Sequence, residues 1–99
     1  MNEDITCEEV KERLDKGTTF NFIDVREEWE YEEANLGAKL IPLGELPNRL
    51  SEIESMKDEE IVIHCKSGNR SGQAKKFLNS KGYGNVRNML GGITEYLDL

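Results

Sequence analysis

Cysteine, histidine and proline are scarce in this sequence. Its 99 residues include two cysteines, Cys7 and Cys65, one histidine, His64, and two prolines. A single pair of cysteines does not make a disulfide framework, so we expect both thiols to be reduced. The sequence shows no metal-ligand motif, and we expect neither a metal nor a cofactor.

Long apolar runs are also absent. Residues 1–12 are acidic and interrupted by charges, unlike the basic start and continuous apolar stretch of a signal peptide. No later apolar run approaches the roughly 20 residues that cross a membrane. We therefore expect a soluble, cytoplasmic protein that does not contact membranes.

Low-complexity sequence is missing as well. The chain is 36% hydrophobic and 33% charged, with nine glycines, which is typical of a globular protein. A chain of this length buries roughly 60 to 70% of its unfolded surface, which is enough for one core. We expect a single domain over residues 1–99.

Acidic residues are unevenly distributed. Residues 61–94 contain no Asp or Glu, although they carry six Lys or Arg residues. Residues 1–60 instead hold 18 acids and seven bases, and the whole chain has a net charge of −7. This division favours a local positive potential that attracts a small anion, while the overall charge disfavours nucleic acid. Alternatively, Lys75, Lys76 and Lys81 form a solvated basic face of a helix.

Short apolar segments alternate with helical patterns along the chain. Strands are predicted at residues 20–25, 40–41, 61–64 and 86–89. Residues 61–64 form a continuous apolar run, which is typical of a central strand covered on both faces. The alternation predicts an α/β fold with a small, open, mainly parallel sheet of four to five strands and helices on both faces.

One predicted helix lies between the second and third strands. The apolar residues that recur there at helical spacing are Leu43, Leu46, Leu50 and Ile53. This spacing predicts a helix that begins close to Glu45, with Pro47 tolerated in its first turn.

A polar loop links the predicted central strand to the next helix. After Cys65 it continues with Lys66, Ser67, Gly68, Asn69, Arg70 and Ser71. In open α/β sheets, ligands bind at the carboxyl ends of the strands. A tight loop that leads into a helix turns backbone N–H groups inward and forms a cradle for an anion. We therefore expect residues 66–71 to bind the substrate.

Cys65 is the candidate nucleophile of this loop. The amides and the charges of Lys66 and Arg70 should favour its thiolate and hold an anionic substrate beside the sulfur. The competing interpretation is a buried structural cysteine. We do not expect His64 to act as its base, because adjacent residues of a strand point to opposite faces.

Three further residues are interpreted as packing residues. Cys7 lies in the first turn of a predicted helix and has no surrounding loop chemistry, so we expect it to be passive. Trp29 and Tyr31 are also expected to pack, with contact to the substrate as the alternative.

Several short motifs follow one another in a fixed order along most of the chain. They are Asp24 to Glu27, Glu30-Tyr31, Gly37-Ala38, Ile41 to Leu43, Glu45-Leu46, Ile63 to Cys65, Gly68, Arg70, Ser71 and Gly91-Gly92. Together they resemble the rhodanese family in its single-domain form. The resemblance implies a sulfurtransferase in which Cys65 takes sulfane sulfur from a small anionic donor such as thiosulfate and holds it as a persulfide. Cyanide or a thiol is then the implied acceptor.

The same resemblance implies roles for the residues around the cysteine. The backbone amides of residues 66–71 should hold the persulfide and the donor. Asp24 and Arg26 should lie beside the pocket as mainly structural residues. For Asp24 the resemblance also allows a role in fixing a neighbouring loop or a cation.

Two alternative functions fit the same residues. A non-enzymatic persulfide carrier or interaction module, serving a protein sulfur acceptor, would present the same loop. Cysteine-dependent phosphatases and arsenate reductases also combine a cysteine and an arginine on an anion-binding loop. In those enzymes the loop has more residues between the cysteine and the arginine than in this chain, where four residues separate Cys65 from Arg70. Residues 66–94 also offer no acid as a proton donor.

Overall fold

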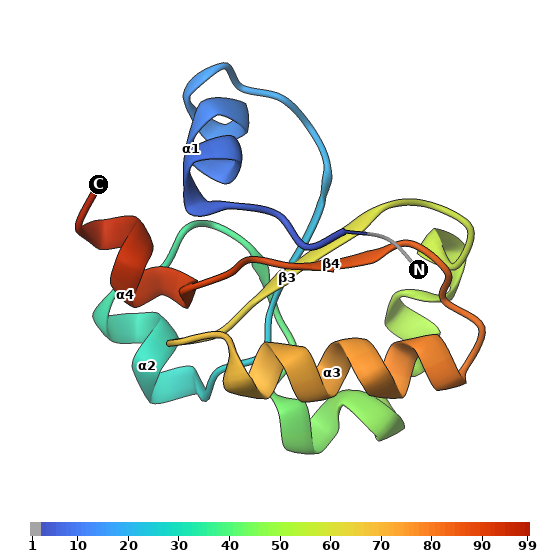
Figure 1. Cartoon of the computed structure of the whole chain (residues 1–99). Coiled ribbons are helices and arrows are strands. Elements are labelled where there is room, and N and C mark those ends of the chain that lie inside the picture. The colour runs from blue at the N-terminus through green and yellow to red at the C-terminus, as the bar shows by residue number, and fades with distance from the viewer. Residues whose placement is uncertain (1–2) are drawn as a thin grey trace.

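Four short strands form one parallel sheet at the centre of the molecule (Figure 1). The computed structural model describes residues 3–99. The strands are β1 (Asn21–Asp24), β2 (Lys39–Leu40), β3 (Ile61–His64) and β4 (Val86–Asn88). Their order is β2-β1-β3-β4, and each neighbouring pair is parallel. The predicted α/β class and small parallel sheet are therefore confirmed, with four strands.

Helices cover both faces of this sheet. The helices of the described residues are α1 (Cys7–Asp15), α2 (Glu28–Glu33), α3 (Asn69–Ser80) and α4 (Gly92–Leu97), and α1 and α3 pack on opposite faces. In Figure 1, α1 lies above the strands and α3 lies below them. Within residues 3–99, no helix combines the length and the apolar character needed to cross a membrane.

Alternate side chains of the strands build two apolar cores. Ile61 and Ile63 of β3 pack with Ala74 and Leu78 of α3 on one face. Val62 belongs to the core that α1 covers on the other face. Because both faces are covered, all four residues of β3 are buried.

Residues 43–56 form three short 3-10 turns instead of the α-helix predicted near Glu45, so that prediction is wrong. The turns are η1 (Leu43–Asn48), η2 (Leu50–Glu52) and η3 (Glu54–Met56). Pro47 has no N–H for an α-helical hydrogen bond, and the backbone closes tighter bonds, such as Ile53 N–H to the Leu50 carbonyl at 3.1 Å. Leu46 and Ile53 are still buried in the core, which accounts for the apolar spacing.

Candidate active site

Cys65 lies directly after β3, where the chain leaves the carboxyl end of the sheet and turns into α3. The residue is 1% exposed. The Gly68 N–H donates a hydrogen bond to the Cys65 Sγ at 3.1 Å. Gly68 has a φ of +104°, a conformation that glycine adopts easily and that leads the chain from the loop into α3. Since α3 begins at Asn69, the positive end of its dipole also lies beside the loop.

Burial and hydrogen bonding act on the Cys65 thiol in opposite directions. Burial raises its pKa, whereas hydrogen bonds from the Ser71 hydroxyl and from three backbone amides lower it. Those amides belong to Ser71, Gly68 and Ser67. The hydrogen bonds prevail, so the pKa of Cys65 lies below its ordinary value and more of the residue is thiolate at neutral pH.

Only some residues of the predicted substrate loop, residues 66–71, contact the sulfur of Cys65. Gly68 and Ser71 contact it, with Ser71 Oγ 3.3 Å from Sγ. The side chains of Lys66, Ser67 and Asn69 are exposed at the rim of the loop. The immediate surroundings of the sulfur are therefore backbone amides and one hydroxyl group.

Arg70 is paired with an acid of α2. Its two terminal nitrogens donate to the two carboxylate oxygens of Glu30 at 2.6 and 2.9 Å. Glu30 is buried, and the hydrogen bonds from Arg70 lower its pKa to about 2. Arg70 interacts electrostatically with Cys65, but its charge is also paired with an acid from outside residues 61–94.

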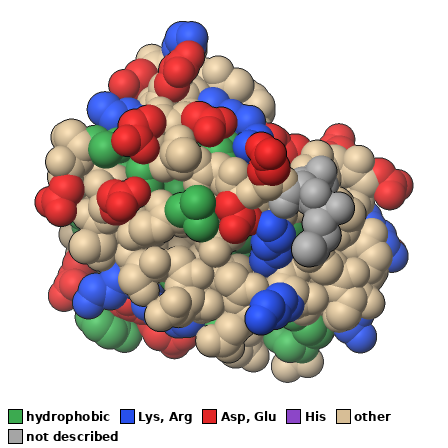
Figure 2. All heavy atoms as spheres, viewed as in Figure 1, with side chains coloured by type: hydrophobic (Ala, Val, Ile, Leu, Met, Phe, Trp, Pro, Cys, Tyr) green, Lys and Arg blue, Asp and Glu red, His purple; other side chains and the backbone are tan. Residues whose placement is uncertain are grey.

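Other cations of the C-terminal half are paired as well. Lys75 Nζ lies 2.6 Å from Asp4 Oδ1, and Arg87 Nη1 lies 2.9 Å from Glu60 Oε2. Figure 2 shows Lys and Arg side chains dispersed among Asp and Glu on the face that it displays. Within the described part of the chain, no carboxylate forms an ion pair with Lys66. At the Cys65 loop, Lys66 therefore adds a charge without a carboxylate partner to the backbone amides and to the ion-paired Arg70.

Asp24 and Arg26 form a buried ion pair at the end of β1. Arg26 Nη2 lies 2.9 Å from Asp24 Oδ2. The same guanidinium group donates to the carbonyl oxygens of Glu30 and Ala34 at 3.4 and 2.7 Å. Arg26 also lines a pocket beside Lys66. The pair therefore fixes α2 next to the Cys65 loop.

The His64 ring lies on the face of the sheet opposite to the Cys65 thiol. It packs on Phe22, with the ring centroids 5.1 Å apart. Its Nδ1 lies 3.4 Å from the Cys65 carbonyl oxygen, and its Nε2 lies 3.5 Å from Asp24 Oδ2. Burial lowers the pKa of His64, which favours the neutral imidazole. His64 thus belongs to the core and contacts the backbone of Cys65, not its sulfur.

The start of α4 supports the Cys65 loop through its backbone. The Ile93 N–H donates to the Cys65 carbonyl oxygen at 2.9 Å. The Thr94 N–H donates to the Lys66 carbonyl oxygen at 3.1 Å. Gly92 permits this approach, because a Cβ there would overlap the Lys66 carbonyl and lie 2.7 Å from that of Cys65. The loop is therefore held between α2 and α4.

A pocket of about 190 Å³ opens beside this loop, between α2 and α4. Its lining includes Arg26, Lys66, Trp29, Ile93 and Leu97. Trp29 is 63% exposed and Leu97 is 60% exposed. The interpretation of Trp29 as a packing residue is therefore wrong. Tyr31 is half-buried, and its hydroxyl donates to the Ala38 carbonyl at 3.0 Å.

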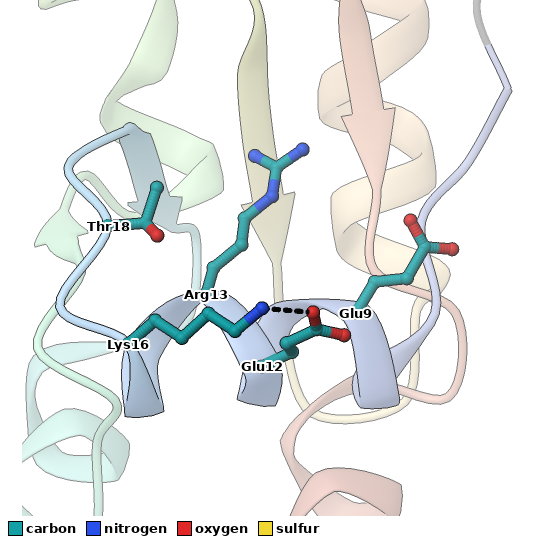
Figure 3. Close-up of a pocket in the computed structure, with 5 residues that line it drawn as sticks. All are labelled: Glu9, Glu12, Arg13, Lys16 and Thr18. Atoms are coloured by element: carbon teal, nitrogen blue, oxygen red, sulfur yellow. Dashed lines mark hydrogen bonds and ion pairs between the residues drawn. The ribbon is translucent and has the colours of Figure 1, made fainter.

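A second hollow, of about 230 Å³, lies on α1 (Figure 3). Its charged side chains bind other side chains of the protein: Lys16 Nζ is 2.7 Å from Glu12 Oε1, and Arg13 pairs with Glu60. Cys7, in the first turn of the same helix, is buried. Burial, and then the nearby Glu95 and Glu8, raise its pKa to about 11. Neither the hollow nor Cys7 offers a reactive thiolate.

Sequence reasoning assigned no role to two residues that contact the loop, Glu30 and Asn88. Asn88 accepts a hydrogen bond from Ser71 Oγ at 2.6 Å and donates one to the Gly68 carbonyl at 3.1 Å. Asn88 is a polar residue at the end of β4, the strand beside β3, and this position is the sequence signal that could have indicated its contact with the loop. Glu30 had no such signal, because its contact with Arg70 spans 40 residues of sequence.

The fold and the loop define a parallel α/β domain that holds a cysteine in a cradle of backbone amides. Residues 6–99 match the rhodanese-like domain family. The chain therefore belongs to this family, whose members include sulfurtransferases and sulfur carriers.

Relatives and a solved structure agree with this placement. The chain is 37% identical over 94 residues to a sulfurtransferase of Allochromatium vinosum, covering 94% of this chain and 86% of that protein. It is 36% identical over 94 residues to the putative sulfur carrier protein YrkF of Bacillus subtilis, covering 94% of this chain but 50% of YrkF. The crystal structure of a rhodanese-related protein from Thermoplasma volcanium superposes with a TM-score of 0.83 at 26% identity, covering 98% of this chain and 92% of that one.

Proposed function

We propose that this protein is a sulfurtransferase that carries sulfane sulfur as a persulfide on Cys65. The Cys65 thiolate attacks the outer sulfur of a donor such as thiosulfate. A bond forms between the two sulfurs as the S–S bond of the donor breaks, and sulfite leaves with the electron pair. Cyanide or an acceptor thiolate then attacks the outer sulfur of the persulfide, and Cys65 leaves as the thiolate.

The observation that carries this proposal is the arrangement of donors around the Cys65 sulfur. Gly68 donates its amide to Sγ at 3.1 Å, and further hydrogen bonds from Ser71 and Ser67 help to lower the thiol pKa. Such a cradle stabilises the attacking thiolate, and the same kind of donor suits the negative charge of a persulfide. The exposed Lys66 at the edge of the pocket supplies a charge that attracts an anionic donor.

Intact mass measurement tests this proposal. After incubation with thiosulfate, the wild-type protein should gain the mass of one sulfur atom and lose it when cyanide or a thiol is added. Cys7→Ser should behave in the same way, whereas Cys65→Ser should gain nothing. Uptake of a removable sulfur atom by Cys65→Ser would show that the assignment is wrong.

Exposed apolar residues beside the pocket favour a second candidate function, the delivery of sulfur to a protein acceptor. Trp29 and Leu97 line the pocket and are 63% and 60% exposed. The exposed acids of α2 around Trp29 are Glu28, Glu32 and Glu33. An acceptor protein with an apolar contact flanked by cationic side chains complements this surface in apolar character and charge. The similarity to the putative sulfur carrier YrkF supports this candidate.

Two synthetic acceptor peptides separate this candidate from transfer to small molecules. Both carry one cysteine and leucines, one with lysines and the other with glutamates in the same positions. The outer sulfur of the persulfide should be transferred faster to the lysine peptide than to the glutamate peptide. Trp29→Ser should remove this difference in rate without changing transfer to 2-mercaptoethanol. Equal rates for both peptides would leave small thiols or cyanide as the acceptors.

A further inference from the structure

The Ser71 hydroxyl lies between two hydrogen-bond acceptors. Its oxygen is 2.6 Å from Asn88 Oδ1 and 3.3 Å from the Cys65 Sγ. Ser71 is fully buried, and Asn88 is 7% exposed. A hydroxyl group carries one hydrogen, so it can donate fully to one of these partners at a time.

The orientation of the Asn88 amide follows from its other contact. Its Nδ2 donates to the Gly68 carbonyl oxygen at 3.1 Å. A carbonyl oxygen only accepts hydrogen bonds, so the amide nitrogen must face Gly68 and the amide oxygen must face Ser71. Asn88 is also fixed through its backbone, because its N–H donates to Asp4 Oδ1 at 3.1 Å.

The protonation state of Cys65 decides whether the two acceptors compete. A neutral thiol can donate its hydrogen to Ser71 Oγ, while the Ser71 hydroxyl donates to Asn88. A thiolate can only accept, so it can gain the Ser71 hydrogen only if Asn88 Oδ1 gives it up. Both contacts, 2.6 Å to oxygen and 3.3 Å to the larger sulfur, are hydrogen-bonding distances, so the two acceptors share one hydrogen and each weakens the bond to the other.

We propose that Asn88 is a positioning residue that competes with the Cys65 thiolate for the Ser71 hydrogen and thereby keeps the thiolate more nucleophilic. This rests on the proposed function of Cys65. A thiolate that receives fewer hydrogen bonds is more basic, and more basic thiolates attack sulfur faster. Once Cys65 carries the outer sulfur, the negative charge resides mainly on that atom, and the Ser71 hydrogen stays with Asn88.

Asn88→Leu tests the proposal, because leucine has nearly the same shape but cannot accept a hydrogen bond. The Gly68 carbonyl keeps a partner in this variant, since it also accepts from the Gly72 N–H at 3.0 Å. Alkylation with iodoacetamide as a function of pH, in a Cys7→Ser background, reports both the thiol pKa and the rate of the thiolate. Asn88→Leu should lower the pKa of Cys65 and reduce the alkylation rate constant of its thiolate by about two- to threefold.

A double-mutant cycle with Ser71→Ala distinguishes this role from a structural one. Without the Ser71 hydroxyl, Asn88→Leu should leave the Cys65 pKa nearly unchanged. Asn85→Ala, just before β4, is the matched control and should change neither the pKa nor the rate. Asn88→Ala adds no bulk and carries the same expectation if the leucine variant does not fold.

Two results would overturn the proposal. One is a Cys65 pKa that rises in Asn88→Leu, which would mean that Asn88 only holds the cradle in shape. The other is a pKa change on Asn88→Leu that is equally large with and without the Ser71 hydroxyl. Alkylation needs no sulfur donor, so its outcome is independent of whether Cys65 forms a persulfide, which the mass measurement decides separately.

Discussion

The carboxylate of Glu30 and the guanidinium group of Arg70 form a two-point ion pair that joins α2 to the first turn of α3. The two hydrogen bonds measure 2.6 and 2.9 Å, and the Glu30 side chain is 9% exposed. Since the pair is nearly neutral as a unit, its main effect is to fix the end of the Cys65 loop.

Replacement of Glu30 by Gln should lower the stability of the protein. The Arg70 side chain is 31% exposed, so solvent screens part of the interaction, and we expect a loss of about 1–2 kcal/mol in the free energy of unfolding. Urea unfolding of the wild type and of Glu30→Gln measures this difference. Glu32→Gln, on the exposed side of α2, is the control and should have no comparable effect.

The Glu30–Arg70 ion pair also predicts how the stability difference between the wild type and Glu30→Gln depends on pH. The pKa of Glu30 falls from 4.5 to about 2 in the folded protein because of Arg70, so folding favours the ionised carboxylate. Its stabilising contribution is complete above about pH 4.5 and is lost as the pH falls toward about 2. The stability difference between wild type and Glu30→Gln should therefore shrink over this range. A difference that stays constant would contradict this.

Lys66 should act on an anionic donor through its charge. Within the described residues no carboxylate pairs with it, and it follows Cys65 in the chain and lines the pocket between α2 and α4. Lys66→Ala should raise the KM for thiosulfate about two- to fivefold at low salt, and less at high salt, where screening already weakens the attraction. Lys76→Ala, exposed on α3, is the charge-matched control. Equal effects of the two variants would mean that Lys66 contributes only to the net charge.

The parts of the fold that depend on local patterns could be predicted from the sequence. The apolar residues 61–64 predicted the central strand, and the polar loop after it predicted a cradle at the carboxyl end of that strand. The placement of His64 away from the thiol followed from the two-residue repeat of a strand.

Other features depend on contacts between distant segments, and these could not be predicted. Arg70 has no nearby acid in sequence, and the Glu30-Tyr31 motif does not indicate that Glu30 pairs with Arg70. The exposure of Trp29 depends on which side of α2 faces the sheet, and six residues are too few for a clear helical repeat. The Asn88 contact with Ser71 likewise requires the order of β3 and β4 in the sheet.

Gly92→Ala should strongly destabilise the protein. A methyl group at this position would overlap the Lys66 carbonyl and lie 2.7 Å from the Cys65 carbonyl oxygen, and the φ of +62° is unfavourable for alanine. We expect a loss of more than about 2 kcal/mol in the free energy of unfolding. Gly44→Ala is the control, because a methyl group there meets nothing within 4 Å. A stable Gly92→Ala protein would mean that α4 can move away from the loop.

The loop should also exclude phosphate chemistry. Four residues separate Cys65 from Arg70, and Arg70 is bound to Glu30 instead of facing an oxyanion. The wild type should therefore transfer sulfane sulfur to cyanide and show no appreciable hydrolysis of an aryl phosphate. Both assays need the Cys65→Ser variant as the blank.

Insertion of one glycine after Gly68 tests whether loop length matters as this geometry implies. The insertion moves α3 relative to Cys65 and displaces the amides that now reach its sulfur, among them Gly68 N–H at 3.1 Å. A displacement of about 1 Å can cost on the order of a hundredfold in rate, so sulfur transfer should fall by about that factor. Phosphate hydrolysis by the wild type that depends on Cys65, without sulfur transfer from any of several donors, would instead indicate a phosphatase. Undiminished sulfur transfer by the insertion variant would show that the amides of the loop are not what activates the thiolate.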